Sequence, residues 1–380
     1  MRKELSLYIH IPFCLSKCHY CAFTSMVAGE ELKTTYTDAL IEEIKLRGKK
    51  YNAKYEVQTI YIGGGTPSSL GIGQVKAIMN TIYNHFTVRN DAEITIEVNP
   101  NTLTKEKIEE YLSENINRFS IGLQAAQGKL LSVIGRTHTY QDFRKAVLML
   151  QEAGVTNISA DVMLGLPSQT VEDVKETIKL VSGLGVKHVS AYILSIEEGT
   201  KFYKLVEANM LELPGENDTI QMYNTACTEL KKRGFARYEF SNFAQIGYRS
   251  KHNIVYWERK QYLGFGASAH SFVEGYRMAN TSDVHEYISH IQKKEIPLCD
   301  KDKITQQDAM EETVMLSLRL AEGIDLLKYE REFGVSLLAQ KKEIITSLVK
   351  NKFIVIDKDN HLRATNQGFL VMDKIISMLA

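Results

Sequence analysis

The chain has 380 residues, of which 44% are hydrophobic and 24% are charged, so it can bury a sizeable core and is not a disordered chain. Lysine and arginine together number 46, and so do aspartate and glutamate. A formal net charge of zero argues against a protein that coats nucleic acid or an anionic membrane, because both functions need an excess of positive charge. The longest apolar runs are shorter than the ~20 residues that span a bilayer.

The first residues predict a strand rather than an export signal. The apolar stretch Leu5–Phe13 contains His10 and Pro12 and leads directly to cysteines, without a small-residue cleavage site. An odd number of cysteines in a chain without an export signal is a poor disulfide framework; the five are Cys14, Cys18, Cys21, Cys227 and Cys299. We therefore expect a cytoplasmic protein with no stable membrane insertion, in which the clustered thiols hold metal.

Short β-rich runs alternate with helical patterns over residues 1–235. The strands are expected at Leu5–Phe13, Gln58–Ile62, Glu93–Val98, Arg118–Leu123, Asn157–Leu164 and His188–Ser195. Helical patterns lie at 34–50, 70–86, 104–114, 140–153, 170–183 and 216–233. This alternation predicts an α/β fold with a parallel sheet and right-handed crossovers. Since the units are too few for a closed eight-fold barrel, we expect an open, partial (β/α)6 barrel with its chemistry at the C-terminal ends of the strands.

Two further segments follow the barrel. Residues 236–300 form a less regular extension that is rich in aromatic residues and glycine. Residues 301–380 predict helices, a hairpin with a turn at Asp359-Asn360, and a last helix over 367–379, which together suggest a small winged-helix-like α+β domain. Such domains often bind DNA, but residues 302–380 hold 11 basic and 12 acidic side chains. We therefore expect a packing or lid role and no nucleic-acid partner.

The most informative motif is C-x3-C-x2-C, formed by Cys14, Cys18 and Cys21 just after the first strand. A tetrahedral zinc site needs four ligands, and His10 or His19 could supply the fourth. A [4Fe–4S] cluster also takes four ligands. Three cysteines on one tight loop would leave one iron open for a substrate or cofactor. The residues alone leave both metal sites possible.

Other polar or glycine-rich motifs follow later strands. The run Gly63-Gly64-Gly65-Thr66-Pro67 lets the backbone approach a ligand closely. Glu97, Gln124 and Asp161 lie on three strands that should line one mouth. Arg136 has the planar guanidinium that suits a carboxylate.

The cysteine spacing in this position resembles the signature of the radical S-adenosylmethionine (SAM) superfamily. The resemblance implies that Cys14, Cys18 and Cys21 hold a [4Fe–4S] cluster whose open iron chelates SAM. It further implies that the cluster can cleave SAM reductively. By the same resemblance, a set of strand-end and loop residues matches the SAM-contact positions of the family: Tyr8, Tyr20, Gly64, Gly65, Thr66, Glu97, Gln124, Arg136, Asp161 and Ser195.

Within the superfamily, the form GGGTP resembles the branch that contains oxygen-independent coproporphyrinogen III oxidase and the HemW-type haem chaperones. The oxidase has a fourth cysteine two residues after the third, and here that position is Phe23. The segment from His252 to Trp257 matches the HNxxYW motif of the chaperones, which is associated with haem binding. A histidine can ligate haem iron, but His252 could equally form hydrogen bonds inside a buried aromatic turn. His270 is a second candidate near the same mouth.

The resemblance therefore implies a haem chaperone that binds a [4Fe–4S] cluster, SAM and haem. It would pass haem to an acceptor protein, for example a respiratory one. The alternative is a radical SAM enzyme that acts on a tetrapyrrole. Phe23 in place of the fourth cysteine argues against coproporphyrinogen III decarboxylation, so whether the chain is an enzyme stays open.

Overall fold

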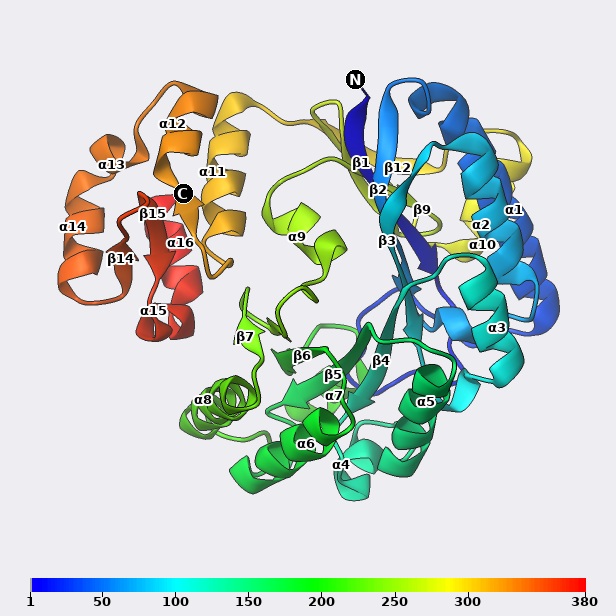
Figure 1. The fold of residues 1–380 in the computed structure, drawn as a ribbon, viewed down its shortest axis with the longest axis horizontal. Helices are drawn as coiled ribbons and strands as arrows, with labels where there is room; N and C mark the ends of the chain where they lie inside the picture. The colour runs from blue at the N-terminus through cyan, green and yellow to red at the C-terminus, as the bar shows by residue number, and fades with distance from the viewer. Residues whose placement is uncertain (1) are drawn as a thin grey trace.

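The computed structural model describes residues 2–380, and its centre is a twelve-stranded sheet (Figure 1). Six parallel strands form the middle of the sheet in chain order: β1 (Lys3–Ile11), β2 (Tyr55–Gly64), β3 (Val88–Val98), β4 (Arg118–Gln124), β5 (Ile158–Leu164) and β6 (His188–Ile193). Each strand expected from the sequence overlaps one of them. The expected class, an open partial (β/α)6 barrel with a small C-terminal domain, is confirmed.

The connecting helices lie around the outside of the curved sheet (Figure 1). They are α1 (Glu30–Tyr51), α2 (Gln74–His85), α3 (Lys105–Ser113), α5 (Tyr140–Glu152), α6 (Val171–Gly183) and α8 (Glu216–Lys232). Thr139 with Asp142 and Thr170 with Asp173 form complete capping boxes, which fix where α5 and α6 begin. Several short elements are too brief to show a helical period and were not expected: η1 (Pro67–Ser69), η2 (Pro100–Thr102), α4 (Gly128–Val133) and α7 (Lys201–Glu207).

Strand β1 shows how the barrel interior becomes available for a site. Every second side chain of β1 is fully buried in the main hydrophobic core: Leu5, Leu7, Ile9 and Ile11. There they share the core with Tyr36, Leu40 and Ile44 of α1. Successive side chains of a strand point to opposite faces. Tyr8 and His10 therefore face the inside of the barrel.

The extension continues the same sheet at both edges. Strand β9 (Tyr262–Phe265) pairs in parallel with β1, and the antiparallel strands β10 (His270–Val273), β11 (Tyr276–Asn280) and β12 (Leu298–Lys303) follow it outward. At the other edge, β8 (Asn242–Ala244) and β7 (Ala236–Arg237) add to β6. Two helices complete the segment, α9 (Lys251–Trp257) and α10 (Val284–Gln292). The sequence predicted only irregular structure here, because these strands are short and need the β1 and β6 edges as templates.

The C-terminal residues pack around a hydrophobic core of their own. Its helices are α11 (Gln306–Ser317), α12 (Leu326–Phe333), α13 (Leu337–Gln340), α14 (Lys342–Lys350), α15 (Asn366–Leu370) and α16 (Met372–Leu379). Strands β13 (Ile324–Asp325), β15 (His361–Ala364) and β14 (Ile354–Ile356) form a separate three-stranded sheet. The expected hairpin is present, and Asn360 adopts the positive φ of 61° that its turn needs.

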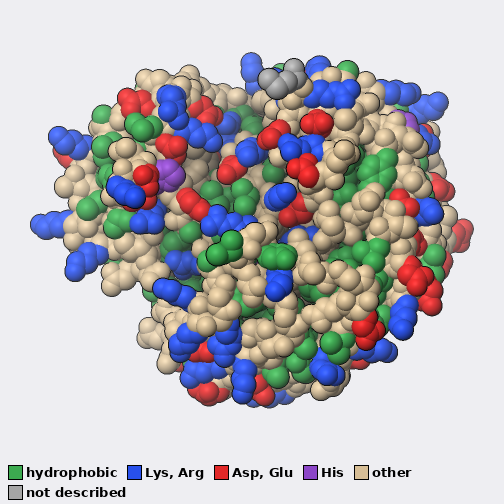
Figure 2. All heavy atoms as spheres, in the orientation of Figure 1, with side chains coloured by type: hydrophobic (Ala, Val, Ile, Leu, Met, Phe, Trp, Pro, Cys, Tyr) green, Lys and Arg blue, Asp and Glu red, His purple; other side chains and the backbone are tan. Residues whose placement is uncertain are grey.

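The surface carries both signs of charge. Figure 2 shows basic and acidic side chains interspersed over the face in view, including that of the C-terminal domain. Among residues 2–380, no helix combines the length and the apolar character that crossing a bilayer demands.

Tyr36 ties the end of β1 to the turn after β9. Its hydroxyl donates to the His10 carbonyl at 2.8 Å and accepts from the Ala267 amide at 3.0 Å. The side chain is fully buried, so no water can replace it as a partner for these two backbone groups. Tyr36 thus holds the start of the cysteine loop against the extension.

Replacing Tyr36 with Phe should lower the free energy of unfolding by about 1–3 kcal/mol, because two buried backbone groups lose their partner. Urea-induced unfolding of the variant measures this loss. Tyr83→Phe is the matched control, since the Tyr83 hydroxyl donates to a single carbonyl from a half-buried position, and it should cost less. An equal stability of Tyr36→Phe and wild type would contradict this role.

Candidate functional site

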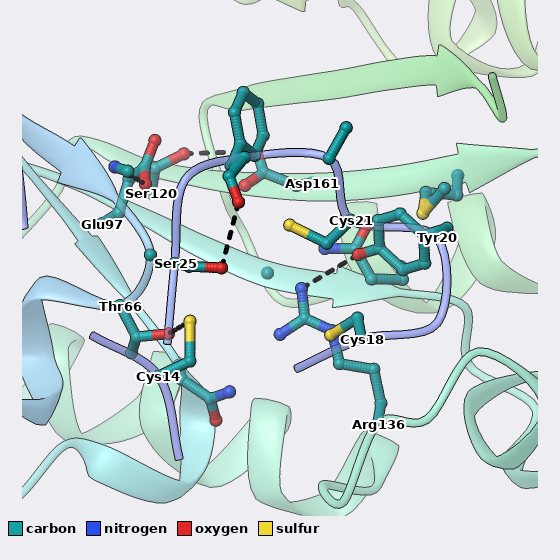
Figure 3. A pocket seen from close by; sticks show the side chains of 18 of the residues that line it. Cys14, Cys18, Tyr20, Cys21, Ser25, Thr66, Glu97, Ser120, Arg136 and Asp161 are labelled. Atoms are coloured by element: carbon teal, nitrogen blue, oxygen red, sulfur yellow. Dashed lines mark hydrogen bonds between the residues drawn. The ribbon is translucent and has the colours of Figure 1, made fainter. Parts of the chain in front are cut away.

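A cavity of about 630 Å³ opens at the C-terminal ends of the parallel strands. The cysteine loop after β1 forms one wall, and residues from the ends of β2 to β6 form the floor and the other walls. Figure 3 shows Cys14 beside Thr66, and Cys18 and Cys21 beside Arg136. The volume lies within the range typical of small-molecule sites.

The cysteine loop is closed on itself by backbone hydrogen bonds. The Cys14 amide donates to the Met26 carbonyl at 2.9 Å, and the Met26 amide donates to the Pro12 carbonyl at 2.8 Å. The Thr66 hydroxyl donates to the Cys14 sulfur at 3.6 Å. The loop therefore leaves the strand and returns to it, with all three thiols between.

The three thiols are half-buried and free of disulfides. Burial raises the pKa of the Cys14 and Cys18 thiols, and the Arg136 charge opposes this rise at both. Without metal these two thiols are therefore protonated at neutral pH. Metal binding would release their protons.

The donor set fits an iron–sulfur cluster with an open iron. Within residues 2–380, no three His, Cys, Asp or Glu side chains converge as ligands of one metal ion. A single zinc ion would need all its thiolates within about 2.3 Å, whereas a cubane cluster takes each thiolate on a different iron. Three thiols that line one cavity from one loop are the donors that such a cluster needs.

The glycine turn after β2 brings bare backbone to the cavity wall. Gly64 has a φ of 112°, and a Cβ there would lie 2.5 Å from the His10 ring. A Cβ on Gly65 would lie 2.8 Å from the Phe13 carbonyl oxygen. Only glycine fits at these two positions, and the turn can approach a bound ligand closely.

Two half-buried carboxyl groups lie in the floor. Glu97 accepts from the Tyr61 hydroxyl at 2.8 Å and from the Gly64 amide at 3.1 Å, and burial raises its pKa to about 7. Asp161 accepts from the Ser120 hydroxyl at 3.2 Å, and burial raises its pKa too. Carboxyl groups that are costly to ionise when the cavity is empty favour a ligand with positive charge or hydroxyl donors.

Arg136 supplies the positive charge on the opposite wall. Its Nη2 donates to the Tyr20 hydroxyl at 3.2 Å, and its buried Nε has no hydrogen-bond partner within residues 2–380. Nearby, the Gln124 side chain accepts from the Tyr192 hydroxyl at 2.7 Å. A half-buried guanidinium with an unused donor is suited to a carboxylate that enters the cavity.

Most residues expected to bind cofactors line this one cavity. They are Cys14, Cys18, Tyr20, Cys21, Gly64, Gly65, Thr66, Glu97, Gln124, Arg136, Asp161 and Ser195. The sequence reasoning missed other lining residues, among them Tyr61, Ser120, Ser190 and Tyr192. A polar side chain near a strand end was the available signal, but it does not say which face of the strand is the inner one.

The remaining two expected residues lie outside the cavity. Tyr8 lines a neighbouring hollow and contacts Nδ1 of His10 at 3.0 Å. His252 is buried at the start of α9, where Nδ1 lies 2.7 Å from the Thr59 hydroxyl and Nε2 lies 2.8 Å from the Tyr256 hydroxyl. Both ring nitrogens of His252 are thus engaged. Burial lowers its pKa to about 3, so the ring is neutral at physiological pH.

Comparison with known proteins agrees with this geometry. Residues 8–181 match the model of the radical SAM superfamily, and residues 304–371 match that of the HemN C-terminal domain. Haem chaperone HemW of Bacillus subtilis is 34% identical over 97% of this chain and 97% of its own length. HemW of Lactococcus lactis is 34% identical over 97% and 95% of the two chains.

The chain belongs to the HemW family of the radical SAM superfamily. The solved structure of coproporphyrinogen III oxidase (HemN) from Escherichia coli superimposes with a TM-score of 0.87 at 23% identity, over 100% of this chain and 90% of that one. That likeness shows the shared fold. In this member of the HemW family, the residues expected to bind cofactors line one cavity, apart from Tyr8 and His252.

The buried neutral His252 should make this HemW-family fold less stable in acid. The unfolded state takes up a proton near pH 6.5 and the folded state does not until about pH 3, so stability is lost as the pH falls below 6.5. Between pH 7.5 and 5.5 the loss from His252 should be about 1 kcal/mol.

Urea unfolding of wild type and His252→Gln at both pH values measures this contribution. The amide of Gln can keep a hydrogen bond but does not titrate. The variant should therefore lose less stability than wild type on acidification. An identical pH dependence of the two proteins would contradict the assignment.

Proposed function

We propose that this chain is a haem chaperone that binds a [4Fe–4S] cluster, SAM and haem and delivers haem to an acceptor protein. Membership of the HemW family supports the proposal. The single structural observation that carries it is the convergence of three thiols, the glycine turn and Arg136 on one cavity.

The cavity residues divide into three roles in this proposal. Cys14, Cys18 and Cys21 bind three irons of the cluster and leave the fourth iron facing the cavity. Arg136 pairs with the SAM carboxylate, for which its buried Nε is a free donor. The backbone at Gly65 lies against the ligand.

The floor carboxylates complete the SAM site. Glu97 and Asp161 accept hydrogen bonds from the amino group and the ribose hydroxyls, and their charge stabilises a cationic ligand. When bound, the cluster would supply one electron to SAM. The chain itself orients SAM and keeps the carboxyl groups in place.

The position after the cysteine motif separates two functions of this scaffold. Phe23 stands two residues after Cys21, where the decarboxylating oxidase has a cysteine, and its side chain is 67% exposed. A phenyl ring can neither ligate iron nor donate a proton. We therefore infer haem carriage rather than decarboxylation of coproporphyrinogen III.

We propose that the three segments of the chain have separate roles. Residues 1–235 hold the cluster and SAM, residues 236–300 add haem contacts, and residues 301–380 pack against the extension, where Glu312 pairs with Arg259 and Arg277. The C-terminal segment has no excess of positive charge for DNA. Free clustered thiols suit a reducing compartment such as the cytoplasm. The acceptor would be a haem protein, for example a respiratory one.

Replacing Cys14, Cys18 or Cys21 with Ala should abolish the brown cluster after anaerobic reconstitution, because each thiol holds a different iron. Iron and sulfide content and the visible spectrum measure it. Cys227→Ala is the control, since Cys227 is a half-buried thiol on α8 outside the cavity, and it should keep its cluster. Normal cluster content in Cys18→Ala would refute the assignment.

Anaerobic incubation of the reconstituted protein with SAM and either coproporphyrinogen III or haem tests the function. We expect haem to bind in a stoichiometric complex and to move to an apo-haem protein, with no change in coproporphyrinogen III. Protoporphyrinogen formed only in the presence of this protein and SAM would instead support the tetrapyrrole enzyme. Zinc in place of iron and sulfide would overturn both.

A further inference from the structure

A second hollow of about 360 Å³ lies beside the SAM cavity and has no role in the site described so far. We call it the aromatic hollow. It is lined by Tyr8, His10, Ala22, Phe23, Thr24, Tyr256, Tyr262, Ser268 and His270. These residues come from β1, the cysteine loop, α9 and the β9–β10 hairpin, so four separate parts of the chain build it.

The two hollows share a wall in the cysteine loop. Ala22 and Phe23 line both. Phe23 lies two residues after Cys21 and is largely exposed. Its phenyl ring is therefore available to pack against a ligand in either hollow.

The histidines around the aromatic hollow differ in whether they can bind iron. His10 has Nδ1 near the Tyr8 hydroxyl and Nε2 2.9 Å from the Thr24 carbonyl. His252 also has both nitrogens engaged. His270, at the start of β10, is exposed and its ring makes no hydrogen bond within residues 2–380. An axial ligand needs a ring nitrogen with a free lone pair, and among these three only His270 offers one.

The walls of the aromatic hollow suit a flat apolar ring. Tyr256 and Tyr262 meet edge to face with their centroids 4.7 Å apart. Together with Phe23 they present aromatic surface that can pack on a macrocycle. The Tyr256 hydroxyl is held by His252, so His252 fixes the orientation of one wall.

A positive charge lies on the same face of the β10–β11 hairpin. His270 pairs with Ala279 and Phe272 pairs with Arg277, which puts His270 and Arg277 on one face. The Arg277 guanidinium lies 3.5 Å from the Tyr262 hydroxyl and bonds Glu312 of α11 at 2.7 Å. A haem propionate carries the charge to pair with Arg277, while Glu312 keeps its second partner, Arg259, at 2.9 Å.

We propose that haem binds in the aromatic hollow with His270 as its axial ligand, with Phe23 and Tyr256 against the ring and Arg277 on a propionate. His252 is a positioning residue that orients Tyr256 and does not touch iron. This inference rests on the haem-carriage function proposed above and says where on the chain haem would bind. Haem then lies next to the cluster loop, with Phe23 between them.

Titration of the full chain with ferric haem, followed by absorption and electron paramagnetic resonance, tests the site. Wild type should bind one haem with the signature of a nitrogen ligand. His270→Ala should lose that signature and at least tenfold in affinity, and added imidazole should restore the signature. His252→Gln should keep the nitrogen signature with a smaller loss of affinity.

His285→Ala is the matched control, because His285 is an exposed histidine of α10 outside the hollow, and it should bind like wild type. Unchanged affinity and signature in His270→Ala would overturn the site while leaving haem carriage intact. Loss of the nitrogen signature in His252→Gln alone would make His252 the ligand and would also overturn it. Absence of stoichiometric binding by wild type would overturn the carriage function itself.

Discussion

The close contact between the glycine turn and the end of β1 is the constraint on which the site depends. The Gly65 amide donates to the Ile11 carbonyl at 2.8 Å, and the Thr66 amide donates to the Phe13 carbonyl at 2.7 Å. A side chain on Gly65 would collide with this backbone. The turn therefore fixes the residue after which the cysteine loop leaves the sheet, and Thr66 then reaches the first thiol. The positions of the thiols relative to the strand-end side chains follow from this one junction.

Much of this arrangement was predictable from the sequence, because parallel strands end at one edge. Glu97 lies near the end of β3, Asp161 lies within β5 and Arg136 comes after β4, yet all three line one cavity. The strand pattern predicted a common mouth for Glu97 and Asp161, whereas the role of Arg136 came from its guanidinium chemistry and from the family resemblance. The sequence does not show which face of each strand points into the barrel, which is why Tyr61 and Tyr192 were missed.

The extension could not be predicted because its structure depends on tertiary partners. Strands as short as β9 form only against the edge of β1. The HNxxYW motif is a helix whose first amides are held by Glu93 of β3. This anchor buries His252 between Thr59 and Tyr256. The sequence had left open a hydrogen-bonded His252 inside a buried aromatic turn, which the structure bears out, but it did not indicate the anchor on Glu93. A histidine and a tyrosine four residues apart do share a helical face, which was the one local signal.

The SAM cavity proposed here and the aromatic hollow adjoin at the cysteine loop. A side chain two residues after the third cluster cysteine lies between them, and here it is Phe23. The central claim is that three thiols leave one iron open to SAM. Hyperfine spectroscopy of the reduced cluster with SAM labelled with ¹⁵N at the amino group and ¹⁷O at the carboxylate tests it most directly. The account predicts magnetic coupling of both labels to the cluster. A cluster signal that is the same with labelled and unlabelled SAM, under conditions where SAM is bound, would contradict it.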